Sequence, residues 1–370
     1  MLHTYVLYPL LMFAIGRGSK NKTAQTSFQE PITIICAAYN EEKVIEEKIH
    51  STFSTNYSGQ VTLFIGTDNC SDRTVDIIKS LQSKYAGLKL KEFTQRTGKI
   101  GILNLLCNEA DSTILVMTDA NVFFTRDTIG KLTAGFANSN TALVCGRVIK
   151  RPANAEAVTQ SEMQYMNFEN KLKSAESEAF GVVMGAEGGC YAFRKEIFQT
   201  IPPHFIADDF FITCLALRSQ KKVLFEESAI AYEDLSANTA GEFRRKARIG
   251  TGNFQNLFFF KDLLAKFWTA TAFCFLSHKV LRWITPFMFV LNVIATILLL
   301  KVCVFFPIVL CAELFLAILP LLNSLVEKTG ARIKLLIAAS HFMVMNAALS
   351  VGFYRFCKGV KSSVWEPVKR

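Results

Sequence analysis

The stretch that decides the fold is ITIICAAYNEE, residues 32–42, in which a mostly apolar run leads directly into a polar cluster. Four more apolar runs follow at 61–66, 88–93, 113–118 and 141–147, and amphipathic stretches separate them. This α/β alternation is typical of a mostly parallel sheet that helices cover on both faces. Ligands of such sheets gather at the carboxyl ends of the strands, so we expect the functional residues directly after each run.

Composition and charge exclude several classes of protein. The 370 residues are 51% hydrophobic and 19% charged, which excludes a disordered chain and a small disulfide scaffold. Residues 261–370 carry 13 basic and 4 acidic side chains, so they hold +9 of the net charge of +10. Because this basic end is also the apolar end, we expect membrane lipids as a partner and no nucleic acid. The 10 cysteines are scattered singly, as expected for buried thiols in a reducing compartment.

The end of the chain carries three apolar segments of about membrane-spanning length, at 284–300, 302–322 and 335–353. The alternative is that they are buried helices of a soluble protein. A shorter apolar run at 4–15 precedes several basic residues, and it is interpreted either as an incomplete anchor or as a segment at the membrane surface. These features predict an integral protein of the cell inner membrane whose main domain is cytoplasmic.

We divide the chain into four parts. Residues 1–24 form a short N-terminal membrane anchor with a basic linker, 25–260 the α/β domain, 261–282 an interfacial segment, and 283–370 a three-segment transmembrane region with a basic tail. Just ahead of the first long apolar segment stand side chains typical of an anchor at headgroup level: Ser277, His278, Lys279, Arg282 and Trp283.

Polar residues follow the second and third apolar runs. Asp68 stands at a strand end, where its carboxylate can accept a hydrogen bond from a planar base, whereas Ser71 and Asp72 are explained more simply as caps of the next helix. Arg96 and Lys99 flank a glycine at the start of a predicted helix, an arrangement that suits a diphosphate.

The fourth run ends in Thr118, Asp119, Ala120 and Asn121. Two oxygen-bearing side chains, those of Asp119 and Asn121, can share a hard divalent cation, Mg²⁺ or Mn²⁺, with phosphate oxygens. A turn with an Asx hydrogen bond explains the same residues, and the pattern alone leaves both interpretations open.

Further along, Asp208 and Asp209 are adjacent carboxylates in an apolar setting. Like charge and burial raise the pKa of at least one such carboxyl, as a general base requires. Arg245 and Arg248 lie on a cationic helix face that can meet a pyrophosphate, or else solvent or lipid headgroups.

The order of these motifs resembles that of the processive-type inverting glycosyltransferases of family 2, a group that includes cellulose, chitin, hyaluronan and poly-N-acetylglucosamine synthases. The resemblance covers about residues 31–255. It rests on six motifs in order: Ala38-Tyr39-Asn40-Glu41-Glu42, Asp68 with Ser71-Asp72, Gly98-Lys99 with Leu103-Asn104, Asp119-Ala120-Asn121, the glycine-rich loop 185–189, and Ala207-Asp208-Asp209.

The resemblance implies a GT-A-type catalytic domain that transfers a sugar with inversion from a nucleotide-sugar donor, with UDP expected, to a glycan or lipid-linked acceptor. Asp209, beside Asp208, would be the catalytic base, and Asp119 with Asn121 would hold the Mg²⁺ or Mn²⁺ cofactor. The remaining donor-binding residues implied are Ala38, Tyr39, Glu41, Asp68, Lys99, Arg245 and Arg248.

Two departures from the family pattern bear on the reaction. Asn121 stands where a second acidic residue is usual, which removes one charge from the metal site. Polysaccharide synthases carry Gln-x-x-Arg-Trp where this chain has Arg245-Lys246-Ala247-Arg248-Ile249, so the Gln and Trp are missing. The alternatives are therefore the addition of a single sugar to a lipid carrier and a catalytically inactive membrane scaffold.

Overall fold

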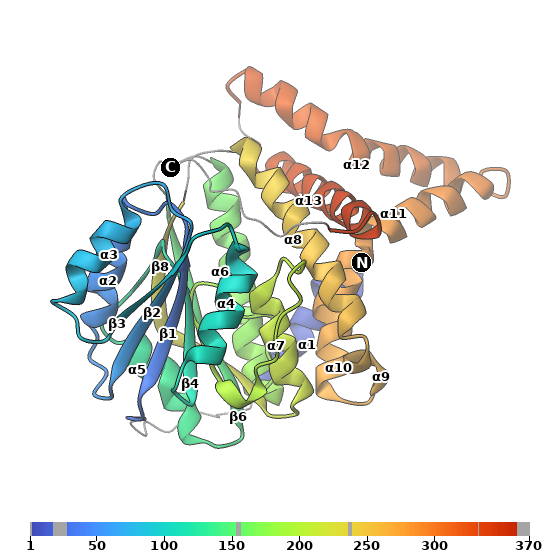
Figure 1. Cartoon of the computed structure of the whole chain (residues 1–370). Coiled ribbons are helices and arrows are strands. Elements are labelled where there is room, and N and C mark those ends of the chain that lie inside the picture. The colour runs from blue at the N-terminus through green and yellow to red at the C-terminus, as the bar shows by residue number, and fades with distance from the viewer. Residues whose placement is uncertain (1, 18–27, 153–156, 236–238, 332, 361–370) are drawn as a thin grey trace.

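The computed structural model describes residues 2–17, 28–152, 157–235, 239–331 and 333–360, and its centre is an eight-stranded sheet (Figure 1). The strand order is β3-β2-β1-β4-β7-β6-β8-β5. The strands are β1 (Ile32–Ala38), β2 (Val61–Asp68), β3 (Leu88–Phe93), β4 (Ile114–Asp119), β5 (Val122–Phe124), β6 (Thr141–Pro152), β7 (Tyr191–Arg194) and β8 (Lys222–Leu235).

The first four strands in this order are parallel, as the sequence predicts. β1 pairs in parallel with β2 and β4, and β2 pairs in parallel with β3. The rest of the sheet is mixed, since β7 runs antiparallel between β4 and β6, β8 is parallel to β6, and β5 is antiparallel to β8. All seven residues of β1 are buried because helices cover both faces of the sheet.

Two sets of helices form these covering layers (Figure 1). Ile34 and Cys36 of β1 point into one core and Ile35 and Ala37 into the other, as the period of two along a strand requires. The helices on the first face are α2 (Ile45–Phe53), α3 (Thr74–Gln82) and α5 (Thr128–Ala134). On the second face lie α4 (Gly98–Glu109), α6 (Ala157–Phe180) and α7 (Asp208–Arg218). Two short 3₁₀ helices are η2 (Gly135–Ala137) and η3 (Lys195–Ile197).

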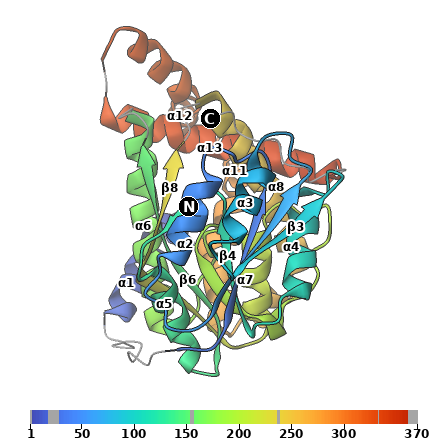
Figure 2. The same ribbon diagram turned by 60° about the vertical axis from the view of Figure 1, so that its left-hand side comes forward.

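The N-terminal apolar run is a π-helical turn, η1 (His3–Leu7), continued by α1 (Tyr8–Gly16), and Figure 2 shows α1 beside α6. Tyr8 and Met12 are fully buried, while Leu7 and Leu10 on the outer face are more than half exposed. The two helices approach so closely that a Cβ on Gly16 would lie 3.1 Å from the Cα of Ala175. One face therefore packs on protein while the other stays apolar, which fits a segment at the membrane surface.

The chain beyond the sheet is helical. Its elements are α8 (Thr239–Phe259), α9 (Asp262–Ala265), α10 (Ala270–Cys274), the π-helical η4 (Phe275–Val280), α11 (Leu281–Leu298), α12 (Phe305–Lys328) and α13 (Lys334–Cys357). Among the described residues, the continuous helix Ala270–Leu298, α12 and α13 are long and apolar enough to cross a membrane. They correspond to the three predicted segments, and α13 packs along α8 (Figure 1).

Four of the five side chains predicted at headgroup level are buried within the protein, and Lys279 is half-buried. His278 and Ser277 are 0% and 1% exposed, and Arg282 and Trp283 are also buried. Carboxylates of α6 bind His278 and Arg282, whereas Trp283 packs against aromatic rings. His278 Nε2 lies 3.0 Å from Glu169, and its Nδ1 lies 2.6 Å from Glu176. The start of this long helix is therefore part of the protein core rather than an exposed anchor.

Candidate active site

The polar residues that follow the strands meet at one edge of the sheet. Ala37 of β1 pairs with Gly66 of β2 on one side and with Asp119 of β4 on the other. Ala38, Asp68 and Asp119 therefore lie at the same carboxyl edge, as a parallel sheet dictates.

Asp68 organises the first part of this edge. It is fully buried, and its Oδ1 accepts the backbone N–H of Thr97 at 2.6 Å, while its Oδ2 accepts the N–H of Gly98 at 3.1 Å and the Nε–H of Arg96 at 3.0 Å. Gly98 has φ +77°, which a side chain would strain. Asp68 thus fixes the loop that leads into α4. Its predicted hydrogen bond to a planar nucleotide base stays a prediction.

Tyr39 and Arg96 form a stacked pair next to this loop. The guanidinium carbon of Arg96 lies 3.6 Å from the centroid of the Tyr39 ring. The backbone N–H of Glu41, whose side chain is 8% exposed, donates to Thr74 Oγ1 at 2.8 Å. These contacts place the opening motif beside the loop after β2. A planar ring of a ligand at this position would have the aromatic surface of Tyr39 and the guanidinium surface of Arg96 nearby.

Asp72 fulfils the capping prediction only in part, because the N-cap residue of α3 is Arg73, whose side chain makes no cap bond. Asp72 Oδ1 accepts the N–H of Thr74 at 3.1 Å, at the start of α3, and its Oδ2 accepts the N–H of Glu42. Asn40 adopts φ 54° and bonds through its side-chain amide with Ser71. These polar side chains hold the first two loops together.

Lys99 joins the predicted metal motif to the predicted base motif. Its Nζ lies 3.0 Å from Asp119 Oδ1 and 3.3 Å from Asp208 Oδ2. Burial works to lower the pKa of the Lys99 ammonium, but the carboxylates of Asp119 and Asp208 outweigh burial and raise the pKa. Lys99 is therefore a fixed positive charge between two strand-end motifs.

Asp209 begins α7 beside Asp208 and lies close to the glycine-rich loop. A Cβ on Gly188 would lie 3.4 Å from Asp209 Oδ2 and 3.8 Å from Asp119 Oδ2, so the bare backbone of the loop faces both carboxylates. Asp209 Oδ1 accepts the N–H of Phe210 at 2.7 Å. Burial, reinforced by the charge of Asp208, raises the pKa of Asp209 to about 6.

The two predicted arginines of α8 lie near different carboxylates. Burial lowers the pKa of the Arg248 guanidinium, and the nearby Asp208 carboxylate opposes that shift. Arg245 acts on Glu233 of β8, whose carboxyl pKa burial raises and Arg245 helps to lower. Arg248 therefore belongs to the carboxylate cluster around Lys99, and Arg245 lies nearer the end of β8.

Asp119 and Asn121 fit a divalent cation that a diphosphate completes. Both offer oxygen atoms, Asp119 is 38% exposed at the strand end, and Asn121 is half-buried. Within the described part of the chain, no three His, Cys, Asp or Glu side chains are grouped so that they could hold a metal ion. Mg²⁺ characteristically takes one or two carboxylates and draws its other ligands from phosphates and water, so this sparse donor set suits it.

Sequence reasoning missed several residues around the site. Lys173 of α6 pairs with Glu187 of the glycine-rich loop at 2.9 Å. Lys48 of α2 is fully buried next to the segment that contains Asp119. Lys48 alone leaves a signal in the sequence, because it interrupts the apolar stripe of an amphipathic helix.

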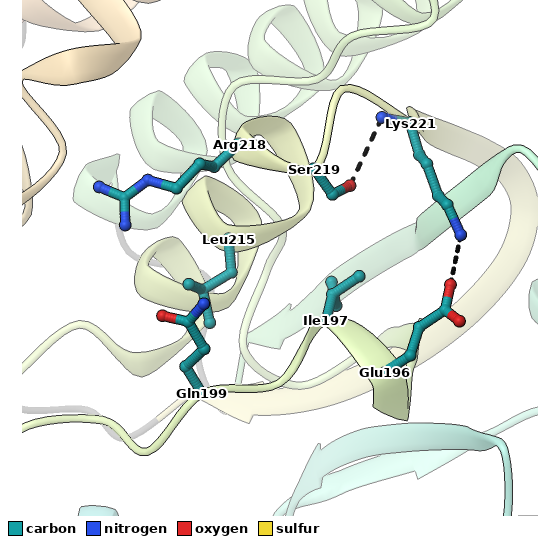
Figure 3. Close-up of a pocket in the computed structure, with 7 residues that line it drawn as sticks. All are labelled: Glu196, Ile197, Gln199, Leu215, Arg218, Ser219 and Lys221. Atoms are coloured by element: carbon teal, nitrogen blue, oxygen red, sulfur yellow. Dashed lines mark hydrogen bonds and ion pairs between the residues drawn. The ribbon is translucent and has the colours of Figure 1, made fainter.

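A pocket of about 460 Å³ lies away from this cluster, at the far end of α7 (Figure 3). Its cations have acidic partners, since Lys221 bonds with Glu196 and Arg218 pairs with Asp262 at 2.6 Å. Leu215 and Arg218, which line the pocket, lie roughly 10 and 15 Å beyond Asp208 along the axis of α7. The pocket is lined by Glu196, Ile197, Gln199, Leu215, Arg218, Ser219 and Lys221, so it contains none of the predicted site residues.

Comparisons with known proteins support the fold and the family. Residues 33–201 match the model of glycosyl transferase family 2. A beta-monoglucosyldiacylglycerol synthase of Trichormus variabilis is 32% identical over 128 residues, which is 34% of this chain and 27% of that protein. The probable glycosyltransferase YdaM of Bacillus subtilis is 22% identical over 234 residues, 60% of this chain and 55% of that protein. The chain thus spans about a quarter to half of these curated relatives.

One solved structure resembles nearly the whole chain. The mannosyltransferase PcManGT from Pyrobaculum calidifontis, in complex with GDP-Man and Mn²⁺, superimposes with a TM-score of 0.68 at 18% identity. The likeness covers 95% of this chain and 94% of the other, so the two proteins share a fold that extends beyond the sheet domain.

Proposed function

We propose, from the premise that residues 33–201 belong to glycosyl transferase family 2, that the chain transfers a sugar from a nucleotide sugar to a hydroxyl of a glycan or lipid-linked acceptor. The observation that carries the proposal is that Asp119 and Asp209 both face the bare backbone of Gly188, while Lys99 contacts Asp119. In this proposal Lys99 binds phosphate, Asp119 ligates a metal and Asp209 is the base.

In this mechanism Asp209 takes the proton of the acceptor hydroxyl. The acceptor oxygen forms its bond to the anomeric carbon as the bond from that carbon to the diphosphate breaks, and attack from the opposite face inverts the configuration. A carboxyl with a pKa near 6 is ionised at neutral pH, yet it is a stronger base than an ordinary aspartate.

The departing nucleoside diphosphate carries the developing negative charge. Asp119 and Asn121 would hold Mg²⁺ or Mn²⁺ on it, and the bound cation would act as a Lewis acid that neutralises this charge. Lys99 and Arg248 would stabilise the same group, and Arg245 would contribute from the end of β8. Ala38, Tyr39, Glu41 and Asp68 would surround the nucleoside, with UDP the first nucleotide to examine.

A lipid-linked acceptor that receives one sugar is the second candidate. Ile249, which is 42% exposed, stands where processive synthases have a tryptophan, so an aromatic platform for a growing glycan is missing there. The three apolar helices would keep the site next to lipid, and the basic C-terminal part would favour the cytoplasmic face of the inner membrane.

The test uses the full chain in detergent with a panel of UDP- and GDP-linked sugars, Mn²⁺, and lipid or glycan acceptors, and it measures released nucleotide. Asp119→Ala and excess chelator should each abolish release, whereas Asp262→Asn, at the far end of α7, should not change it. Chromatography of the product distinguishes a single added sugar from a polymer. No release with any donor would overturn the proposal in favour of an inactive scaffold.

A further inference from the structure

Lys48 is a buried ammonium that the proposed mechanism does not use. It lies in α2, on the stripe of buried residues Ile45, Lys48, Ile49 and Thr52, and it is 0% exposed. Its Nζ donates to Thr118 Oγ1 at 2.6 Å and to the carbonyl oxygen of Val122 at 2.5 Å. The side chain thus reaches from the helix layer to the edge of the sheet.

The two acceptors bracket the metal-binding segment. Thr118 immediately precedes Asp119 in β4, and Val122 immediately follows Asn121 at the start of β5. Because side chains alternate along a strand, Thr118 points to the α2 face and Asp119 to the opposite face, where Lys99 contacts it. The Lys48 ammonium therefore bonds to both ends of segment 118–122, on the face of the sheet opposite to Lys99.

Burial of the Lys48 ammonium costs free energy, because the cation loses its hydration. The two hydrogen-bond acceptors are a hydroxyl and a carbonyl, and the Phe124 ring centroid lies 4.1 Å from Nζ. Burial lowers the pKa of Lys48 to about 8, which reflects the cost of a cation in this apolar layer. A Met or Leu would fill the same stripe without that cost.

We propose that Lys48 is a positioning residue for the divalent cation: by holding Thr118 and Val122 it directs Asp119 and Asn121 toward the metal of the donor complex. The inference rests on the proposed function, because it presupposes that Asp119 and Asn121 ligate a metal. Groups that orient metal ligands typically change metal affinity or activity by about 10- to 100-fold when they are removed.

The test measures Mn²⁺ binding by the full chain in detergent with UDP or GDP present, because diphosphate oxygens complete the proposed site, and electron paramagnetic resonance follows the ion. Lys48→Met keeps the length and apolar stem of the side chain but removes both hydrogen bonds, so the Kd for Mn²⁺ should rise by about tenfold or more. The matched control is Thr52→Val in the same helix, which removes the hydrogen bond from Thr52 Oγ1 to the Lys48 carbonyl. It should lower the melting temperature while leaving Mn²⁺ affinity within about twofold of wild type.

A purely structural role predicts a different result. Lys48→Met would then lower the melting temperature but bind Mn²⁺ as Thr52→Val does, and this outcome would overturn the inference. If Lys48→Met does not fold, Thr118→Val provides the test, because it removes only one hydrogen-bond acceptor of Lys48. This variant should bind Mn²⁺ a few-fold more weakly than wild type. Unchanged Mn²⁺ binding would contradict the inference.

The double variant adds a stricter check. If Lys48 acts through Thr118, the double variant Lys48→Met with Thr118→Val should bind Mn²⁺ no more weakly than Lys48→Met alone. Two additive losses would instead show independent effects and contradict the coupling. If the wild-type chain fails to bind Mn²⁺ with UDP or GDP present, the metal assignment and this inference are both overturned. If the wild-type chain binds Mn²⁺ and the variants bind it equally well, only this inference is overturned.

Discussion

Asp209 is a carboxylate whose surroundings favour its neutral form. It lies at the start of α7, where burial and the adjacent charge of Asp208 raise its pKa and the cation of Lys99 partly opposes them. The same surroundings that make it a better base also make its charged form costly to the fold. Activity and stability should therefore respond to Asp209 in opposite directions.

The prediction at this scale concerns pH and one substitution. Asp209 must be ionised to accept a proton, so turnover should fall about tenfold per pH unit below about pH 6. Asp209→Asn should reduce turnover by on the order of a hundredfold or more. Because the folded pKa lies above the unfolded one, the ionised group destabilises the fold above about pH 6 and less as pH falls through that value.

Asp209→Asn should therefore raise the melting temperature at pH 8 by a few degrees. Initial rates against pH and thermal unfolding of both proteins test this. An acid limb that stays near pH 4, or loss of activity in Asp208→Asn but not in Asp209→Asn, would show that the roles in the pair are assigned wrongly.

At the scale of elements, the glycine-rich loop shows what close approach requires. Gly188 faces two carboxylates across ordinary contact distances, whereas a Cβ on its neighbour Gly189 would lie 2.6 Å from Val122 Cγ2. The two adjacent glycines are therefore required for different reasons. Gly188 leaves room in front of the reacting groups, and Gly189 lets the loop pack against β5.

These two positions give a matched prediction. Gly188→Ala should place a methyl group beside Asp119 and Asp209 and reduce turnover by roughly tenfold, with little change in melting temperature. Gly189→Ala should instead lower the melting temperature, since the strand must shift. Gly130→Ala, in α5, where a Cβ meets nothing within 4 Å, is the control: it should leave turnover unchanged and raise the melting temperature slightly, because alanine favours a helix more than glycine does. Equal thermal destabilisation by the first two variants would contradict this division.

The elements also show why part of the fold was predictable from sequence. β1 begins and ends where its apolar run does, because a strand covered by helices on both faces has a continuous hydrophobic sequence. The edge strand β3 instead alternates apolar and charged residues and is only partly buried. β5 has three residues and β7 four, too few for a pattern, and they are stabilised by antiparallel neighbours distant in the chain.

The same limit applies to the site. Asp119 and Asp209 follow or begin regular elements, so their roles can be inferred from position. The contact of Lys48 with Thr118 joins residues 70 positions apart, and that of His278 with Glu176 joins residues 102 apart. Sequence spacing does not predict such pairs. The Lys48–Thr118 contact forms where α2 packs on the sheet, and the His278–Glu176 contact forms where η4 meets α6.

At the scale of the molecule, the apolar helices should keep the chain in the membrane. Leu298 is 77% exposed, Ile308 65% and Leu321 63%, and their surroundings on α11 and α12 are similarly apolar. We therefore expect membranes to retain the full chain through washes with high salt or alkaline carbonate and to release it with detergent, because screening removes charge attraction but not apolar contact. Fractionation and immunoblotting test this, and release by salt alone would favour buried helices of a soluble protein.

The sheet domain and the first long helix share a single hydrophobic core. Phe275 and Trp283 are buried in the same cluster as Leu103, Tyr191 and Phe211 of the sheet domain. His278 lies between Glu169 and Glu176, and Tyr8 of α1 donates to the same Glu176 at 2.5 Å. The division at residue 260 therefore cuts through the core, although the sequence changes character there.

The last prediction follows from that shared core. A piece comprising residues 28–260 lacks Phe275 and Trp283, each the kind of side chain whose removal costs about 3–5 kcal/mol, and it exposes the apolar side chains that they cover. Together these losses, about 6–10 kcal/mol, are comparable to the roughly 5–15 kcal/mol that stabilises a typical domain. The piece should therefore aggregate or lack a cooperative thermal transition, whereas a piece ending at residue 300 should fold in detergent. Calorimetry and near-ultraviolet circular dichroism distinguish a folded piece from an aggregated or non-cooperative one. If the 28–260 piece is soluble and unfolds cooperatively, the core does not depend on the helix that begins at Ala270.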